Sequence, residues 1–580
     1  MKLMEALEIL KNGPGPEAPV LPFFLACGFT PLHLLTLLKA HAQKRNPAVR
    51  MEIETGLFGD LPGSLHRAAG SSAQGAAVVI EWPDFDPRLG LRQLGGWNPD
   101  ALPDLIQSVA GGASRLEAGI QRLAETCPVA VSLPTLPLPP CFATAGWQAG
   151  MGEWHLREIV TSLARRLAAI PRVRLLSPQR LDRVSPSGER YDIKADLTTG
   201  FPYQLGHADK LAALLATLLA NPAPKKGLIT DLDDTLWHGI LGEAGPQGVS
   251  WDLAAHAQIH GIYQQFLSAL AASGVLLGVA SKNDPRLVDE ALERTDLHVA
   301  RQQLFPIEAH WQPKSQSVVR ILQTWNIGPE AVVFVDDSPM ELAEVAHAYP
   351  EMECVLFTPR DADAVFQLLE RLRDTFGKAA VSEEDRIRAE SIRTVVARQA
   401  AADGETNQDQ FFEQAGAVLQ FCFDKDPADN RTFDLVNKTN QFNLNGRRYG
   451  EAEWQSRIEN PRSFLMTASY RDKFGPLGKI AVVMGREAGS HLRIDTWVMS
   501  CRAFSRRIEH QCLRQLYQHF GVTEVVLDFV STPRNGPTRE FLTAFGTPQP
   551  EFRLTRQYFE AACPPLFHSL ENPPVDGRRA

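Results

Sequence analysis

One short stretch, residues 228–237 (LITDLDDTLW), constrains the fold of this chain more than any other. It begins with an apolar run that contains β-branched residues, as a buried strand of a parallel sheet does. Two carboxylates, Asp231 and Asp233, follow, and the alternation of side chains places them on one face of the extended chain. Ligands of open α/β sheets bind at this end of the strands. Two close carboxylates are unfavourable without a cation, although a strand that runs into an Asp-rich turn has the same pattern.

Further polar groups follow the next expected strands. A second apolar run delivers Ser281, and a third delivers the pair Asp336 and Asp337, with Lys314 between them in the sequence. The two runs span 274–280 and 331–335. The order of carboxylate pair, hydroxyl, lysine and second acidic pair resembles the haloacid dehalogenase (HAD) superfamily.

This resemblance implies a role in phosphoryl transfer for each group. Asp231 is expected to attack phosphorus and to carry an aspartyl-phosphate. Asp233 is expected to protonate the leaving oxygen and then to activate water. Lys314 would balance negative charge, and Ser281 would hydrogen-bond a phosphoryl oxygen.

The resemblance also implies a Mg²⁺ site. The expected ligands are Asp231, the backbone carbonyl of Asp233, and Asp336, with water completing the octahedron. Asp337 is expected to support the metal through water or an outer hydrogen bond. The residues expected to contact substrate in this domain are Thr235 and Asn283.

Whole-chain numbers narrow the class of protein. At 580 residues the chain is too long for one core, so three or four domains are expected. The net charge of −9 provides no basic field for nucleic acid. The eight cysteines form no CxxC pair, which favours reduced thiols over disulfides or a zinc site. No leader peptide and no apolar stretch of roughly 18 residues is evident, so we expect a cytoplasmic protein without a membrane partner.

Residues 1–222 alternate strand and helix patterns, which predicts a parallel sheet. The arrangement resembles a flavodoxin-type or SGNH-hydrolase fold. An SGNH hydrolase carries a nucleophilic serine after its first strand, where this chain has Thr30, a weak substitute. Asp196 and His207 lie near the usual triad positions, but their spacing is too long for the DxxH pattern. We therefore expect a non-catalytic domain that serves packing or partner docking.

Residues 223–375 are the expected HAD domain. The connection after its first strand is short and is expected to hold one helix at 253–271, which predicts a capless, open site suited to a large or carrier-tethered substrate. The motif at 231–237, with Gly242-Glu243 and Ser281-Lys282-Asn283, resembles the FkbH-like branch of HAD proteins. The remaining expected boundaries are a linker helix at 376–407, a third domain at 408–560 and a tail at 561–580.

The third domain resembles the C-terminal part of FkbH-like proteins, which is similar to a GNAT acyltransferase fold of the α+β class. GNAT folds cradle the coenzyme A pyrophosphate with a glycine-containing turn. Ser505 and Arg507 occupy the two glycine positions here, and their side chains obstruct a close approach of the backbone. This argues against acetyl-CoA binding, while Arg506 and Arg507 can still pair with a phosphopantetheine phosphate.

Cys501 has two interpretations. A thiol at a strand end, with arginines nearby, can have a depressed pKa and accept an acyl group; a small buried residue is the alternative. Cys512 is expected in the core. The amide-rich segment 437–443 indicates either a pocket wall or a well-capped turn. The residues expected to contact substrate in this domain are Arg502 and Asn440.

FkbH-like proteins are implied to take a glyceryl unit from 1,3-bisphosphoglycerate, remove its phosphate and pass the acyl group to an acyl carrier protein in polyketide-type biosynthesis. The expected partners are the carrier's phosphopantetheine arm and a small phosphorylated substrate. Two alternatives stay open. One is a stand-alone phosphatase acting on a sugar or other metabolite phosphate, and the other is a scaffold that docks carrier proteins.

Overall fold

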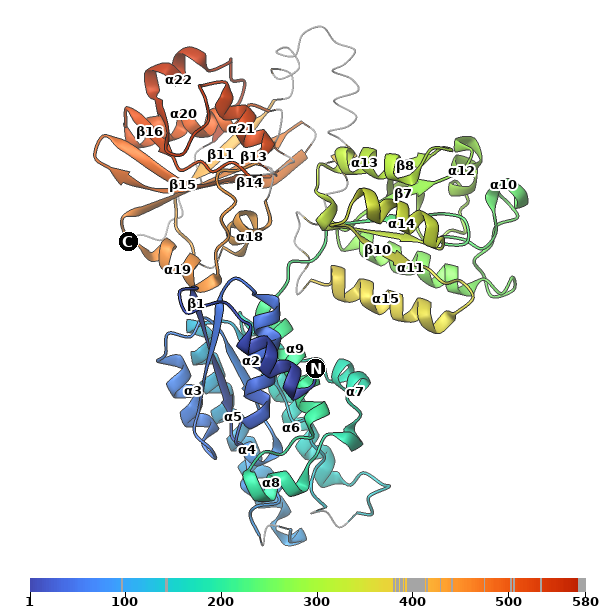
Figure 1. Ribbon diagram of the computed structural model, residues 1–580, viewed down its shortest axis with the longest axis vertical. Helices are drawn as coiled ribbons and strands as arrows, with labels where there is room; N and C mark the ends of the chain where they lie inside the picture. Colours follow the sequence, from blue (N-terminus) through green and yellow to red (C-terminus); the bar gives the residue numbers. More distant parts are fainter. Residues whose placement is uncertain are drawn as a thin grey trace. The chain divides into compact units, whose positions relative to one another are not determined.

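The computed structural model describes residues 1–94, 97–140, 144–378, 416–427, 429–439, 442–473, 475–500, 506–532 and 535–571, with 381, 385, 390, 392–393, 413 and 503. Contacts divide the chain into two units, Met1–Pro222 with Gly450–Gln455, and Ala223–Tyr449 with Ser456–Ala580. The described residues form three sheets, one in the first unit and two in the second (Figure 1). Among the described helices, none is long and apolar enough to cross a membrane.

The first unit is built on a parallel sheet with the strand order β2-β1-β3-β4-β5. Its strands are β1 (Val20–Cys27), β2 (Arg50–Thr55), β3 (Ala76–Val79), β4 (Val129–Ser132) and β5 (Val173–Leu175). Its longer helices are α1 (Leu3–Lys11), α2 (Leu32–Arg45), α3 (Leu61–Ala69), α5 (Leu102–Thr126), α6 (Met151–Ala168) and α9 (Leu205–Ala220); the shorter ones are α4 (Trp82–Phe85), α7 (Pro178–Val184) and α8 (Ile193–Thr199). Phe24 and Ala26 of β1 enter one core, and Leu25 and Cys27 enter another, so both faces of the sheet are covered. The predicted parallel sheet is therefore confirmed.

A second parallel sheet holds the acidic motif, with the strand order β10-β9-β6-β7-β8. Its strands are β6 (Gly227–Thr230), β7 (Leu276–Ser281), β8 (Leu304–Ala309), β9 (Val332–Asp336) and β10 (Glu353–Leu356), and its helices are α10 (Leu241–Ala244), α11 (Gln258–Ala272), α12 (Pro285–Leu292), α13 (Lys314–Trp325), α14 (Pro339–Ala348) and α15 (Ala362–Phe376). Leu228 and Ile229 point into cores on opposite faces. Because β6 pairs with β7 on one side and β9 on the other, the polar residues at the ends of these three strands meet at one edge.

The connection from β6 to β7 contains only the four-residue helix α10 before α11, so no cap domain is inserted there. The helix expected from residue 253 instead begins at Gln258. Asp252 explains the difference, because its side chain accepts the N–H of Ala255 and its carbonyl accepts that of Ala257, which closes a turn. His256 in this turn has a left-handed φ of 54°, which a helix does not allow.

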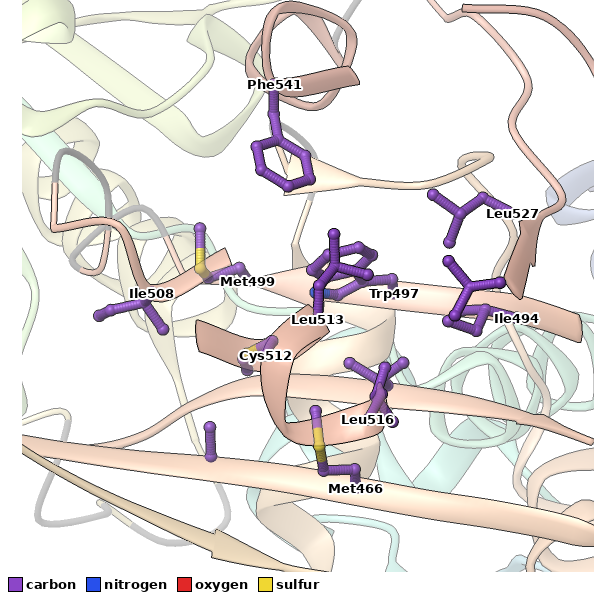
Figure 2. Packing of buried hydrophobic residues seen from close by; sticks show 14 of the residues in the cluster. Met466, Ile494, Trp497, Met499, Ile508, Cys512, Leu513, Leu516, Leu527 and Phe541 are labelled. Atoms are coloured by element: carbon purple, nitrogen blue, oxygen red, sulfur yellow. The ribbon is translucent and has the colours of Figure 1, made fainter. Parts of the chain in front are cut away.

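The third sheet is mixed, and its described strands have the order β17-β16-β15-β14-β13-β11-β18, with β12 beside β15. The strands are β11 (Val418–Cys422), β12 (Phe442–Asn443), β13 (Ser463–Asp472), β14 (Gly475–Ala488), β15 (His491–Met499), β16 (Glu524–Leu527), β17 (Phe552–Thr555) and β18 (Ser569–Glu571). The helices are α18 (Asn430–Lys438), α19 (Glu451–Glu459), α20 (Ile508–Phe520), α21 (Gly536–Thr543) and α22 (Arg556–Ala562). Leu513 and Leu516 of α20 pack over Trp497 of β15 and Met466 of β13 (Figure 2). Cys512 is fully buried in this core, as predicted.

One expectation for the C-terminal region needs correction, and another is not tested. The segment from residue 561, expected to be a tail, completes α22 and then forms β18, which pairs in parallel with β11. A three-residue strand is too short to produce a readable pattern, and only the exposed edge of β11 gives it a partner. The linker helix expected at 376–407 lies almost entirely outside the described residues.

The described part of the amide-rich segment supports the turn interpretation. Asn443 Oδ1 accepts the backbone N–H groups of Asn445 and Gly446 at 3.2 and 2.8 Å. Asn437 exchanges two hydrogen bonds with the backbone of Tyr449. Both side chains are thereby used to hold the chain, and Asn443 is 2% exposed.

Candidate active site

The nucleophile candidate Asp231 follows β6 directly. Its backbone N–H donates to Val335 O at 3.0 Å, which extends the pairing of β6 with β9 by one residue. Its side chain is buried, and Lys314 Nζ lies 2.9 Å from its Oδ1. The same ammonium lies 2.5 Å from Asp336 Oδ2, at the end of β9. Lys314 is the first residue of α13 and is 4% exposed, so it spans two carboxylates inside the protein.

Three carboxylates form a possible metal site. Asp231, Asp336 and Asp337 each place one oxygen within 4.8 Å of the other two. Their three negative charges face the single positive charge of Lys314. Asp231 Oδ1 is also buried without a well-oriented hydrogen bond. An all-oxygen donor set with excess negative charge fits a small hard cation such as Mg²⁺.

The electrostatics of the site follow from this crowding. Burial raises the pKa of Asp231 to about 6, against the lowering effect of Lys314. Burial and the carboxylates of Asp231 and Asp234 raise the pKa of Asp337 to about 6. Burial also raises the pKa of Asp336. Burial lowers the pKa of Lys314, but Asp231 and Asp336 raise it by more, so the ammonium stays charged.

Asp337 differs from its expected place. The sequence assigned it an outer supporting role, whereas the structure places its carboxylate in the group of three. Thr235 Oγ1 donates to Asp337 Oδ1 at 3.5 Å. Asp337 is therefore a candidate ligand in its own right, and it follows the strand end by only one residue.

Thr235 and Asn283, the residues expected to contact substrate, both contact other residues of the site. Thr235 has no solvent exposure, and its carbonyl lies 3.0 Å from His260 Nδ1. Asn283 is 2% exposed, and its Nδ2 donates to Asp233 Oδ2 and Ser281 Oγ, each at 3.0 Å. Both side chains thus hold other residues of the site, and a contact of either with substrate stays a prediction.

The carboxylate of Asp233 is not one of the three grouped carboxylates and accepts its own set of hydrogen bonds. Trp237 Nε1 donates to its Oδ1 at 3.0 Å, and the N–H of Leu241 donates to the same oxygen at 3.1 Å. The turn between them is tight, because Asp234 adopts a left-handed φ of 48° and its Oδ1 accepts the N–H of Gly239 at 2.9 Å. The carboxylate of Asp233 is thus separate from the candidate metal ligands, as an acid and base requires.

Sequence reasoning missed the part played by Trp237. In the sequence the tryptophan only ends a family-like motif. The indole returns to Asp233 only because the chain turns sharply over four residues, and an aromatic residue at that spacing carries no such signal by itself. The residues Cys501, Arg502 and Asn440, predicted for the third domain, lie outside the described residues.

The triad-like residues of the first unit do not form a catalytic arrangement. His207 is 1% exposed, with Nε2 3.1 Å from Thr135 Oγ1 and Nδ1 2.9 Å from Ser185 Oγ. Asp196 instead accepts the hydroxyl of Tyr191 at 2.7 Å. Thr30 Oγ1 packs against Gly200, where any β-carbon would lie 2.7 Å from it. Thr30, Asp196 and His207 each contact other residues, so these three do not form a triad.

Comparisons with known proteins agree with the fold. No family model matches the chain, and no curated protein matches it. The N-terminal part of BF1531 from Bacteroides fragilis, containing a phosphatase domain complexed with Mg, is similar over 66% of this chain and 100% of its own, with 17% identity and a TM-score of 0.51. At this identity the likeness shows the fold alone. The salicylyl-acyltransferase SsfX3 from a tetracycline biosynthetic pathway covers 36% of this chain and 55% of its own at 15% identity, but its TM-score of 0.22 supports no argument.

Proposed function

We propose that this chain is a Mg²⁺-dependent phosphohydrolase of the HAD type. The observation that carries the proposal is the buried group of Asp231, Asp336, Asp337 and Lys314 at the carboxyl ends of β6 and β9. Buried like charges at this density are costly unless they bind a cation. The fold shared with the Mg-complexed phosphatase domain of BF1531 supports the same conclusion.

The chemistry uses two carboxylates with different surroundings. An oxygen of Asp231 attacks phosphorus while Asp233 gives its proton to the leaving oxygen, so one P–O bond forms and another breaks. Water then attacks the aspartyl-phosphate, Asp233 takes the water's proton, and the bond from phosphorus to Asp231 breaks. Lys314 offsets the charge on Asp231 throughout. A bound Mg²⁺ supplies charge neutralisation for the phosphoryl oxygens.

We further propose, from the resemblance to FkbH-like proteins, that the substrate is 1,3-bisphosphoglycerate. The thiolate of Cys501 attacks the acyl carbon, the acyl-phosphate leaves as phosphate, and a thioester forms. Arg502 and Asn440 are the proposed substrate contacts at this step. The phosphopantetheine thiol of an acyl carrier protein then displaces the sulfur of Cys501, and Asp231 removes the remaining phosphomonoester.

Intact mass spectrometry tests this sequence of steps. The full chain is incubated with 1,3-bisphosphoglycerate, Mg²⁺ and a phosphopantetheinylated carrier protein, and both proteins are weighed. A glyceryl adduct on the carrier is the expected result. Asp231→Asn should leave a phosphoglyceryl adduct, and Cys501→Ala should leave none. The absence of any adduct on either protein contradicts the transfer step.

A stand-alone phosphatase is the second candidate, and one observation favours it. The acidic group, Lys314, Asp233 and Ser281 all belong to the strands, loops and helix of the second parallel sheet, between residues 231 and 337, so hydrolysis needs no residue of another domain. Full turnover of phosphomonoesters by Cys501→Ala, with no acyl adduct in the natural chain, selects this candidate. A scaffold that only docks carrier proteins has no use for the buried acidic group. Phosphate release that depends on Asp231 would exclude the scaffold hypothesis.

A further inference from the structure

The two oxygens of Asp233 have different surroundings. Oδ1 accepts two N–H groups, from the indole of Trp237 at 3.0 Å and the backbone of Leu241 at 3.1 Å. Oδ2 accepts one, from Asn283 Nδ2 at 3.0 Å. A carboxylate oxygen offers about two acceptor positions. Oδ1 is therefore filled, while Oδ2 keeps one position open.

Trp237 has little freedom to move. Its side chain has no solvent exposure and packs in the core that also contains Leu228 of β6 and Val335 of β9. The backbone N–H groups of Leu236 and Trp237 both point at Leu232 O, at 2.7 and 3.2 Å. The sheet core and this turn together aim the indole N–H at Asp233.

Asn283 links Asp233 to the phosphoryl side of the site. Its Nδ2 contacts Ser281 Oγ at 3.0 Å as well as Asp233 Oδ2. Ser281 ends β7, next to the strand that delivers Asp231. Oδ2 is therefore linked through one amide to Ser281, the expected contact of a phosphoryl oxygen, whereas Oδ1 contacts the indole of the core residue Trp237.

We propose that Trp237 is a positioning residue that fixes Asp233 so that Oδ2 alone exchanges the proton. This inference rests on the proposed phosphohydrolase function. In the first step the O–H bond at Oδ2 breaks, and the proton moves to the leaving oxygen as the P–O bond breaks. In the second step Oδ2 takes a proton from the attacking water. Trp237 touches no reacting atom and acts only through Oδ1.

Leaving-group dependence separates this role from a structural one. Release of an alkoxide, as from glycerol 3-phosphate, needs a proton from the acid, whereas p-nitrophenolate leaves without one. Trp237→Phe keeps an aromatic ring and removes the N–H. We expect kcat for glycerol 3-phosphate to fall by about tenfold or more, and kcat for p-nitrophenyl phosphate by no more than about twofold.

Trp251→Phe is the matched control. Trp251 is buried in the same core, and its indole N–H also donates, but to the backbone carbonyl of Asp296 at 3.1 Å. Trp251→Phe should change kcat by the same factor for glycerol 3-phosphate and for p-nitrophenyl phosphate. Asn283→Ala, which removes the donor to Oδ2, provides a second variant if Trp237→Phe does not fold, and it should show the same bias toward p-nitrophenyl phosphate.

The outcomes are distinct. Equal losses on both substrates in the folded Trp237 or Asn283 variant overturn the inference and leave the proposed function in place. A natural chain that hydrolyses neither substrate with Mg²⁺ contradicts the proposed function itself. A fall in kcat for glycerol 3-phosphate alone supports both the inference and the proposed function.

Discussion

Lys314 decides the charge state of the site. Its ammonium lies 2.9 Å from Asp231 Oδ1 and 2.5 Å from Asp336 Oδ2, with almost no exposure to water. Without it, the buried carboxylates lose the cation that pairs with Asp231 and Asp336 among the described residues. Removing one partner of a buried ion pair leaves an uncompensated charge and is strongly destabilising.

Lys314→Gln should therefore lower the free energy of unfolding by about 3 kcal/mol and reduce kcat by about 100-fold or more. Urea denaturation and phosphate release measure the two effects. Lys225→Gln is the control, because Lys225 also pairs with a carboxylate, Glu353 at 3.3 Å, but outside the site. A loss of stability no greater for Lys314→Gln than for the control contradicts the account.

At the scale of elements, α9 is tied to the loops around it by one buried histidine. His207 of α9 contacts Thr135, which follows β4, and Ser185, which ends α7. Thr135 in turn donates to the buried carboxylate of Glu81 at 2.5 Å. Burial, and then the charge of Arg190, lower the pKa of His207 to about 3. The folded unit therefore holds a neutral imidazole.

The lowered pKa of His207 determines how the stability of this unit depends on pH. The unfolded chain takes up this proton near the ordinary pKa of about 6.5, whereas the folded chain does so only near pH 3. The stabilisation by His207 is thus present above pH 6.5 and falls by about 1.4 kcal/mol per pH unit below it. Hydrogen exchange of β4 should show that His207→Gln costs less stability at pH 5 than at pH 7.5. The control His66→Gln replaces an exposed histidine, and its effect on stability should be the same at both pH values. If the effect of His207→Gln is also the same at both, the neutral state of the buried imidazole is contradicted.

Elements buried on both faces were the predictable ones. The runs that became β1, β6, β7 and β9 are continuous and apolar, because helices cover both sides of each parallel sheet. The start of α11 and the strand β18 were missed. The first depends on a turn at Asp252, and the second on the free edge of another strand, and neither leaves a periodic signal.

At the scale of the whole molecule, the candidate site is assembled from strands far apart in the sequence. Sequence order placed Asp231, Ser281, Lys314 and Asp336 in one site, because parallel strands end at the same edge. It did not reveal the approach of Asp337 to the others or the return of Trp237 to Asp233, since both depend on side-chain directions after the strand ends.

At this scale we predict that removing the metal lowers the stability of the folded chain. Mg²⁺ at about 100 times its dissociation constant should stabilise the folded chain by about 2.7 kcal/mol, and EDTA should remove that gain. Hydrogen exchange of the β6 and β9 peptides localises the effect. Asp336→Asn, which replaces one fully buried ligand, should abolish most of it. Equal stabilisation of the variant and the natural chain would place the ion elsewhere.

The most direct measurement is the position of the transferred phosphoryl group. The chain is mixed with a phosphomonoester and Mg²⁺, quenched in acid during turnover, and digested for peptide mass spectrometry. The account predicts a phosphoryl group on the peptide that contains Asp231 and its absence from Asp231→Asn, which should not turn over. A phosphoryl group on another residue, or continued turnover by Asp231→Asn, would contradict it.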